Sequence, residues 1–190
     1  NDFDDTLTAI QGDNDCDGLL NSNDDCPNDA LNDYDNDGLC GDIDFVCNGS
    51  YTIDDQDTVG DLGIIANCIA ITNNLIISDT LLDDLQGLEN LEIVGGVLEI
   101  VNNSTLQNLN GLSALTLVGS NFNLQQNVSL FQINALSNIT SILGNITISN
   151  NDALDNLDGL SSLSTIGDYF FLQSNNALTN IDGLSLLQSI

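Results

Sequence analysis

The sequence predicts a mainly β protein: a parallel β-solenoid of coils about 24 residues long, preceded by a loop segment rich in aspartate and cysteine. Three observations lead to this fold class. Apolar residues recur at a fixed interval from Cys68 to the end of the chain. Aspartates alternate with other residues in two stretches that precede this repeat. All five cysteines lie between residues 16 and 68.

The interval of the repeat is read directly from the aligned coils. Their consensus is L-x-x-I-G-x-x-L-x-I-x-N-N-x-x-L-x-x-L-x-G-L-x-x, and self-similarity at such a period is the signature of a repeat architecture. A shorter coil begins at Cys68 and a further coil starts at Leu187. The four full coils between them begin at Leu91, Leu115, Ile139 and Leu163.

Each coil carries an L-x-I pattern that is typical of a strand. Leu98 and Ile100 show it in one coil, and Phe122 and Leu124 in the next, so both side chains of a pair point to one face. No segment has a helical stripe long enough for a helix in every coil. We therefore expect successive coils to stack as neighbouring strands about 4.8 Å apart. A single coil cannot bury its own apolar face, so stability must come from stacking.

An asparagine recurs at the turn after this strand, and it forms an all-asparagine column of Asn103, Asn127, Asn151 and Asn175. Stacked asparagines tolerate the turn conformation and hydrogen-bond along a stack. Two of the four also lie in N-S-T and N-V-S sequences, which are glycan attachment signals. The regularity of the column favours the hydrogen-bonded ladder.

The charge of the chain excludes several functions. It has no Lys, Arg or His and 29 acidic residues, giving a formal net charge of −29. Such a chain is repelled by nucleic acid and by anionic membrane surfaces, and it lacks the residues of His triads, Schiff-base lysines and arginine clamps. No run of about 18 apolar residues suggests a membrane span, and the first residues lack a basic signal-peptide region. We expect a mature form if the protein is exported.

Two acidic stretches have the spacing of a calcium-binding loop. Each reads D-x-D-x-D-G-x5-D, with glycines at Gly18 and Gly38 for the sharp turn. The expected ligands are the carboxylates and the position-7 carbonyls of Asp13, Asp15, Asp17, Leu19, Asp24, Asp33, Asp35, Asp37, Leu39 and Asp44. Ca²⁺ takes six to eight oxygens, so the pattern predicts at least two Ca²⁺ ions as structural cofactors. Mg²⁺ and a disordered acidic linker are the alternatives.

This acidic segment resembles the thrombospondin type 3 repeat. The stretch "DNDCDGLLNSNDDCPND", followed by "NDYDNDGLCGD", carries the resemblance over about residues 13–47. The resemblance implies calcium wrapped by chain with little other secondary structure, braced by disulfides and placed beside an adhesive domain. Cys16 and Cys40 depart from the family's positions, so its disulfide pairing does not transfer to this chain.

The clustered cysteines predict disulfides formed in an oxidising compartment. Zinc would need four thiolates in the absence of histidine, and paired C-x-x-C units are missing. Cys16 with Cys26 would close the first loop. Cys40 with Cys47, or Cys47 with Cys68, would close the following segment, and one thiol stays unassigned.

The solenoid resembles the receptor L-domain family of leucine-rich-repeat-like solenoids. The motifs "LSTIGDYFFLQSNNALTNIDGLSLL" and "CNGSYTIDD…NCIAIT", the second similar to a cysteine-linked cap, carry this resemblance over residues 47–190. It implies a right-handed extracellular solenoid used for adhesion or recognition. The resulting domain organisation is a lead segment at 1–12, thrombospondin type 3-like repeats at 13–46 and the solenoid at 47–190, with its cap at 47–68.

Two surfaces of the solenoid are candidates for contacts. The last coil stops partway, which predicts either more chain or self-association, including head-to-tail stacking into a surface filament. The outward sheet residues Tyr169, Phe171, Asn123 and Thr147 form a face for glycan or for another protein, or simply a solvated face with aromatics at a subunit contact.

Catalysis is not expected. Asp158 and Asp182 lie one repeat apart, and carboxylates about 5 Å apart serve in retaining glycosidases. However, Asn110 and Asn134 occupy the same column, so a role in the turn is sufficient. The sequence therefore predicts an extracellular, calcium-stabilised structural or adhesive protein that is not an enzyme. The alternative is a surface module that recognises glycan or protein.

Overall fold

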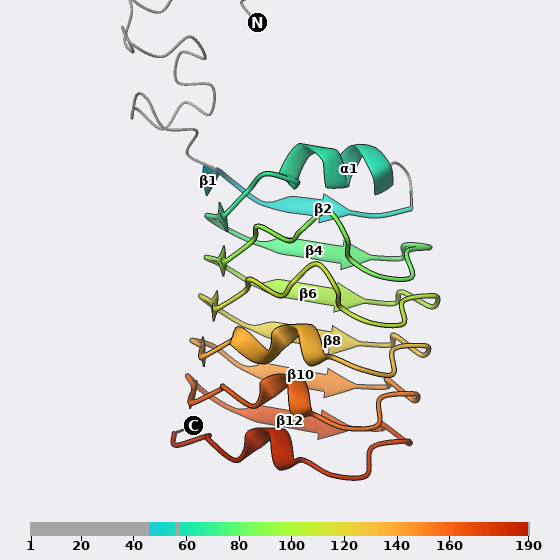
Figure 1. Ribbon diagram of the computed structural model, residues 1–190, viewed down its shortest axis with the longest axis vertical. Coiled ribbons are helices and arrows are strands. Elements are labelled where there is room, and N and C mark those ends of the chain that lie inside the picture. Colours follow the sequence, from blue (N-terminus) through green and yellow to red (C-terminus); the bar gives the residue numbers. More distant parts are fainter. Residues whose placement is uncertain (1–45, 56–57, 190) are drawn as a thin grey trace, which may run out of the picture. The chain divides into compact units, whose positions relative to one another are not determined.

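The computed structural model describes residues 46–55 and 58–189, with side chains from residue 62 onward in the second range (Figure 1). The chain divides into two units, Asn1–Asp44 and Phe45–Ile190. The described part of the chain lies entirely within the second unit. No helix in that part is long and apolar enough to cross a membrane.

Two parallel six-stranded sheets run along the solenoid, one strand of each per coil, and confirm the predicted fold class (Figure 1). The broad sheet contains β2 (Tyr51–Ile53), β4 (Leu75–Ser78), β6 (Leu98–Val101), β8 (Phe122–Gln125), β10 (Ile146–Ser149) and β12 (Phe170–Gln173). The narrow sheet contains β1 (Val46–Cys47), β3 (Ala70–Ile71), β5 (Ile93–Val94), β7 (Leu117–Val118), β9 (Ser141–Ile142) and β11 (Thr165–Ile166). The chain winds in the right-handed sense that parallel strand connections almost always take.

The register between strands reproduces the sequence period. Ile146 pairs with Phe122 on one side and with Phe170 on the other, so neighbours in the sheet are 24 residues apart. Leu75 pairs with Leu98, which is the 23-residue interval of the shorter first coil. A one-residue slip would expose the apolar set, so the buried face fixes this register.

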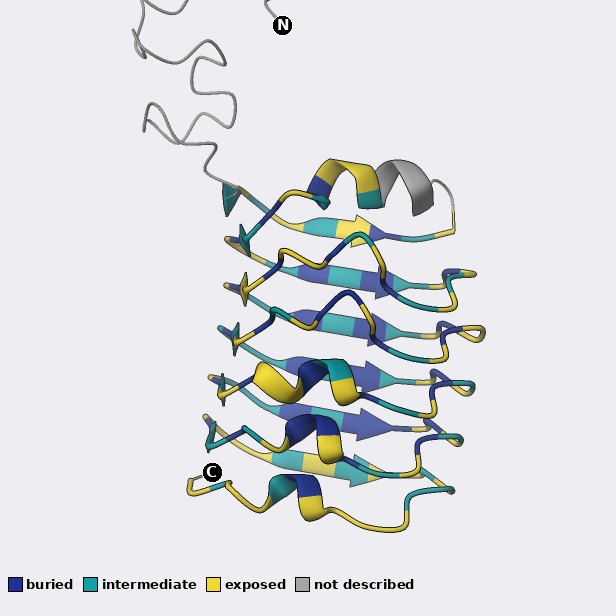
Figure 2. Cartoon of the chain, viewed as in Figure 1, coloured by how far each residue is buried: buried dark blue, intermediate teal, exposed yellow. Residues whose placement is uncertain are grey.

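The core is a continuous apolar column inside the coils, seen as the dark blue inner positions in Figure 2. Along β4, β6 and β8, buried residues alternate with half-buried ones, as the L-x-I pattern predicts. Leu98, Phe122 and Ile146 are all 0% exposed. In the last coil, Phe170 is only half-buried because no described strand covers it on that side.

The predicted asparagine ladder (Asn103, Asn127, Asn151 and Asn175) is confirmed. Each side-chain oxygen accepts the backbone N–H of the equivalent residue one coil earlier, which is Thr80 for Asn103 and an asparagine for the others. Asn103 N donates to Asn127 Oδ1 at 3.1 Å, and Asn127 N to Asn151 Oδ1 at 3.0 Å. Each amide nitrogen donates to a core-strand carbonyl, as in Asn127 Nδ2 to Ile100 O at 2.9 Å. Asn103 and Asn127 are 0% exposed, which leaves no space for a glycan at the N-S-T and N-V-S sequences.

A left-handed residue precedes each ladder position. The column is Asp79 (φ 58°), Asn102 (φ 60°), Gln126 (φ 59°), Asn150 (φ 59°) and Ser174 (φ 53°). Asparagine and aspartate visit this region more readily than other non-glycine residues do. Gln126 and Ser174 are therefore the two positions at which the backbone is least suited to the side chain.

Replacing Gln126 with glycine is expected to raise the free energy of unfolding by about 0.5–1 kcal/mol. Relief of a left-handed penalty of about 1–2 kcal/mol exceeds the extra unfolded-state entropy of glycine, about 0.5–1 kcal/mol. Thermal and urea unfolding would measure the change. Gln125→Gly is the matched control, because Gln125 lies in β8 and its replacement should destabilise. A loss of stability in both variants would contradict the prediction.

The turn that follows the ladder changes type halfway along the solenoid. In the first two coils Gly87 and Gly111 adopt φ values of 111° and 108°. The next coil has Ala135 at this position, and an alanine disfavours positive φ. There the chain forms a 3₁₀ helix, η1 (Asn134–Asn138), and the later coils repeat it as η2 (Asp158–Leu160) and η3 (Asp182–Leu184) (Figure 1). Because Gly159 and Gly183 occupy this position in the later coils without a positive φ, alanine accounts for η1 but not for η2 and η3.

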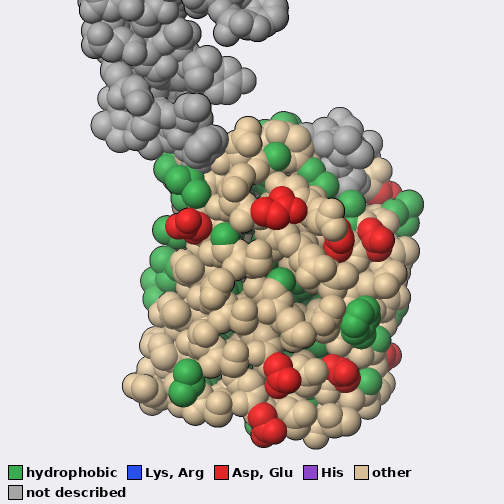
Figure 3. All heavy atoms as spheres, in the orientation of Figure 1, with side chains coloured by type: hydrophobic (Ala, Val, Ile, Leu, Met, Phe, Trp, Pro, Cys, Tyr) green, Lys and Arg blue, Asp and Glu red, His purple; other side chains and the backbone are tan. Residues whose placement is uncertain are grey.

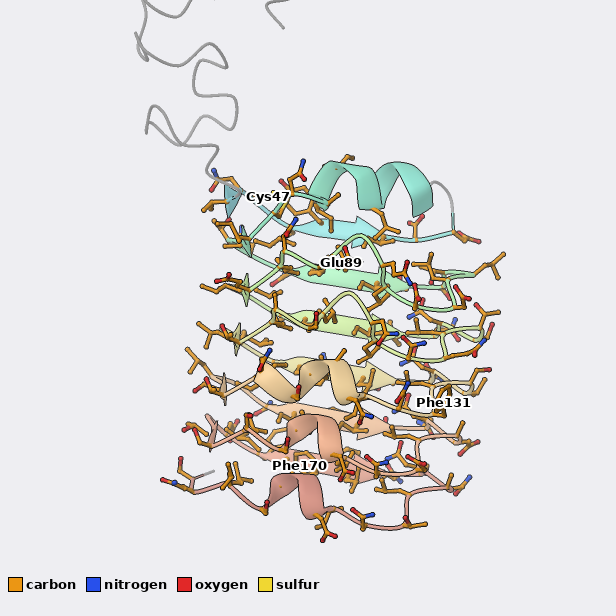
Figure 4. All side chains as sticks on the ribbon, in the orientation of Figure 1. Cys47, Glu89, Phe131 and Phe170 are labelled. Carbon is orange, nitrogen blue, oxygen red and sulfur yellow. A yellow bond between two sulfur atoms is a disulfide. The ribbon has the colours of Figure 1, made fainter. Side chains whose placement is uncertain are left out.

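The first coil is covered by a short cap. Helix α1 (Thr58–Ile65) lies over it, and a disulfide joins Cys47 in β1 to Cys68 with the two Cα atoms 5.7 Å apart (Figures 1 and 4). Of the two partners that the sequence left open for Cys47, Cys68 is therefore the correct one. Ile65 and Cys68 are 1% and 2% exposed. Cys16, Cys26 and Cys40, which the sequence also predicts as disulfide partners, lie outside the described residues.

Removing the disulfide with Cys47→Ala is expected to destabilise the protein by about 3 kcal/mol. The crosslink closes a loop of 21 residues, and loops of that size restrict the unfolded chain by roughly this amount. Hydrogen exchange should show faster opening of β1 and α1 than of β8, since coils contact only their neighbours. Unchanged exchange in the cap would count against this role of the disulfide.

Candidate functional site

The predicted calcium ligands, residues 13–24 and 33–44, lie outside the described residues. In the part of the solenoid that the structure describes, no group of three or more Asp, Glu, Cys or His side chains is arranged to hold a metal ion. The carboxylates on the face shown in Figure 3 are spread singly or in small groups, without Lys or Arg among them. An anionic ligand would find no compensating charge on this surface.

The structure brings the predicted contact residues together on the outer face of the broad sheet. Thr147 pairs with Asn123 on one side and with Phe171 on the other, so these three form one column across β8, β10 and β12. Tyr169 comes two residues before Phe171, directly before the start of β12. The two aromatic side chains are 50% and 44% exposed.

Asn123 and Thr147 leave their polar groups available on this face. Both are half-buried, and neither side chain makes a hydrogen bond within the described part of the chain. A half-buried amide and hydroxyl beside an exposed aromatic ring are the groups from which sugar sites and protein contacts are commonly built. The column therefore offers donors, acceptors and a flat apolar surface, with strands about 4.8 Å apart.

Other amides of this face are used by the fold itself. Asn74 Oδ1 accepts the N–H of Val97 at 2.9 Å, and Asn121 Oδ1 accepts the N–H of Asn145 at 2.9 Å. These bonds join the start of one broad strand to the next coil. This structural role of Asn121 was not predicted from the sequence. The recurrence of asparagine just before the strand was the available signal.

A further asparagine column holds the turn that follows the ladder, both in a coil with a positive-φ glycine and in two coils where a 3₁₀ helix begins there. Asn108, Asn156 and Asn180 each accept the backbone N–H of the residue two positions later, at 2.9, 2.9 and 3.1 Å. In this Asx turn the side chain replaces a backbone acceptor. Asp158 and Asp182 are the capped residues in two of these turns, and their side chains are exposed. Sequence reasoning did not identify the asparagine column that holds them.

Small hydroxyl side chains also link the coils. The hydroxyls of Thr116, Thr140 and Ser164 donate to the backbone carbonyl of the equivalent residue one coil earlier, at 3.1, 3.4 and 3.0 Å. These residues stand beside the narrow sheet. Their role is to satisfy backbone acceptors, and they add no ligand group to the face of the broad sheet.

Comparison with known proteins gives no relative from which a function could be transferred. No family model, curated protein or solved structure matches this chain.

Proposed function

We propose that this chain is an extracellular structural or adhesive protein in which calcium-binding repeats of thrombospondin type 3 kind precede a receptor L-domain-like solenoid. The supporting observation is the combination of a disulfide-capped β-solenoid with two complete D-x-D-x-D-G-x5-D stretches immediately before it. A disulfide is typical of proteins that fold in an oxidising compartment. A catalytic function is not part of the proposal, and neither nucleic acid nor insertion into a membrane is.

The donor set of the acidic stretches fits a hard cation. Every proposed side-chain ligand is a carboxylate, and the position-7 residues Leu19 and Leu39 would add backbone carbonyls. Bound Ca²⁺ would neutralise aspartates that otherwise repel one another, since the chain carries no basic residue. The last of these aspartates, Asp44, is separated from β1 by a single residue. The proposed metal segment thus leads directly into the disulfide-held cap.

Calcium removal is expected to change the shape and protease resistance of the whole protein. With at least two ions bound, calorimetry should titrate two or more sites, and EDTA should increase the radius of gyration and expose residues 13–44 to proteolysis. Asp13→Ala/Asp33→Ala removes position 1 of each loop and should reduce both effects. Asp158→Ala/Asp168→Ala removes two exposed solenoid carboxylates as the matched control. Identical scattering and cleavage with calcium and with EDTA would refute the calcium function.

We also propose self-association at the ends of the solenoid, as in a head-to-tail surface filament. The supporting observation is that β12 has one described neighbour, β10, and an unpaired strand edge is a template for further pairing. Electron micrographs and sedimentation with and without chelator would test this. Particles that stay monomeric in calcium would contradict the filament. Calcium binding is tested independently by the titration described above.

The second candidate function is recognition of glycan or protein on the broad sheet. It is favoured by the column of Asn123, Thr147 and Phe171, in which Thr147 lies between Asn123 and an exposed ring. Neither polar side chain has a hydrogen-bond partner among the described residues. A glycan array and a pull-down with surface proteins should show binding that Phe171→Ala weakens at least about tenfold, as for a central aromatic contact. Phe131→Ala is the control, because Phe131 is 43% exposed on a turn (Figure 4). Equal binding by both variants would contradict this face as the site.

A further inference from the structure

The chain contains two Asn-Gly pairs, Asn48–Gly49 and Asn110–Gly111. An asparagine before glycine is chemically labile, because glycine has no Cβ to keep its backbone nitrogen away from the preceding side-chain carbonyl. The two glycines have nearly the same φ, 105° and 108°. From sequence and backbone angle alone, the two pairs should therefore react alike.

Hydrogen bonding separates the two sites. The N–H of Gly49 donates to Thr72 Oγ1 at 2.9 Å, and the carbonyl of Asn48 accepts the Tyr51 hydroxyl at 3.1 Å. The N–H of Gly111 makes no hydrogen bond within the described residues. The backbone nitrogen that must attack the asparagine side chain is therefore hydrogen-bonded at Gly49, whereas at Gly111 it has no hydrogen bond within the described residues.

The surroundings of Asn110 hold its backbone while leaving its side chain accessible. Its N–H donates to Asn108 Oδ1 at 2.9 Å, and its carbonyl accepts the N–H of Leu85 at 2.8 Å. The side chain is exposed and has no hydrogen bond to the described protein. Water thus reaches the side-chain amide, and no hydrogen bond to the described protein needs to break before it reacts.

We propose that Asn110 is a site of spontaneous deamidation in the folded protein, whereas Asn48 is protected. The Gly111 nitrogen gives its proton to water or hydroxide and attacks Cγ of Asn110. In the resulting tetrahedral intermediate the side-chain nitrogen takes a proton from water, its bond to Cγ breaks, and ammonia leaves. A five-membered succinimide remains. Addition of water to one of the two ring carbonyls then gives aspartate or isoaspartate, with no oxidant or reductant involved.

The two products have different consequences for the stack. Aspartate stands before glycine at the same position in two later coils, as Asp158 and Asp182, so the repeat accepts it. Isoaspartate inserts an extra carbon into the main chain where Asn110 accepts the Leu85 N–H. It would weaken the contact between the first two coils, and either product adds one negative charge.

The test is an incubation of the complete protein at neutral and mildly alkaline pH, in buffer and in urea. Peptides from a chymotrypsin-type protease, needed because the chain has no Lys or Arg, are then read by mass spectrometry. In buffer, Asn110 should deamidate about tenfold faster than Asn48, since the latter must first break a hydrogen bond. In urea the two rates should converge. Equal rates in buffer, or faster reaction at Asn48, would overturn the proposal.

Two matched comparisons check the stated cause. Thr72→Val removes the hydroxyl that holds the Gly49 N–H, and it should raise the Asn48 rate toward that of Asn110. An unchanged Asn48 rate would show that this bond is not the protection. Asn134 occupies the column of Asn110 but precedes Ala135, and it should stay intact over the same time. Deamidation at Asn134 as fast as at Asn110 would likewise overturn the proposal.

Discussion

Asn127→Ala is expected to lower the free energy of unfolding by about 4 kcal/mol, since each buried polar group left without a partner costs about 1–3 kcal/mol. The Asn127 side-chain oxygen accepts the backbone and side-chain N–H groups of Asn103, both at 3.1 Å. Its amide nitrogen donates to Ile100 O at 2.9 Å and to Asn151 Oδ1 at 3.3 Å. All of these groups are buried, so water cannot replace the missing side chain.

Urea unfolding followed by circular dichroism would measure this loss. Asn138→Ala removes one exposed bond, from Asn138 Nδ2 to Ser113 O at 2.7 Å, and should cost below about 1 kcal/mol. Asn127→Asp keeps the shape but replaces both N–H donors by a buried charge, so it should be no better tolerated than alanine. A loss at Asn127 as small as that at Asn138 would mean that the ladder contributes little to stability.

Phe122→Ala should cost about 3–5 kcal/mol, the range for a large aromatic removed from a packed core. Phe122 lies in β8 and is 0% exposed. It pairs with Leu98 in the coil before and with Ile146 in the coil after. The cavity would therefore lie in the middle of the stack, where two interfaces share it, and neither coil could close it alone.

The same coil supplies the control for this prediction. Phe131→Ala removes an equal volume from a turn where the ring is 43% exposed, and it should cost about 1 kcal/mol or less. Differential scanning calorimetry would compare the two variants. If they shift the transition equally, the stabilisation does not come from the apolar column inside the coils.

The fold was predictable from the sequence because residues that stack on one another in space recur at a fixed interval along the chain. A residue in β8 lies against its equivalents in β6 and β10, 24 residues away, so all three meet the same environment. Selection for one environment repeated along the chain produces visible columns. Leu98, Phe122 and Ile146 are one such column, and the asparagine ladder is another. For Cys47, the clustering of the cysteines between residues 16 and 68 left two possible disulfide partners, Cys40 and Cys68.

The candidate site was less predictable, because asparagine has several roles that look identical in a sequence. The Asn123 amide makes no hydrogen bond within the described residues. Two residues earlier, Asn121 Oδ1 accepts the backbone N–H of Asn145 in the next coil. Asn108 holds a turn and Asn127 holds the ladder. Which of these roles an asparagine has depends on the distance between its side chain and the backbone of the neighbouring coil. The sequence does not give that distance.

The sequence by itself determined the coil length, the parallel strand, the inward apolar columns and the asparagine ladder, since each follows from a repeated local pattern that only stacking can bury. Only the tertiary structure decided the pairing of Cys47 with Cys68, the helical cap, the change of turn type at Ala135 and the difference between Gly49 and Gly111. These features depend on what one coil presents to the next. Hydrogen bonds and close contacts across that interface join residues that are about two dozen positions apart in the chain.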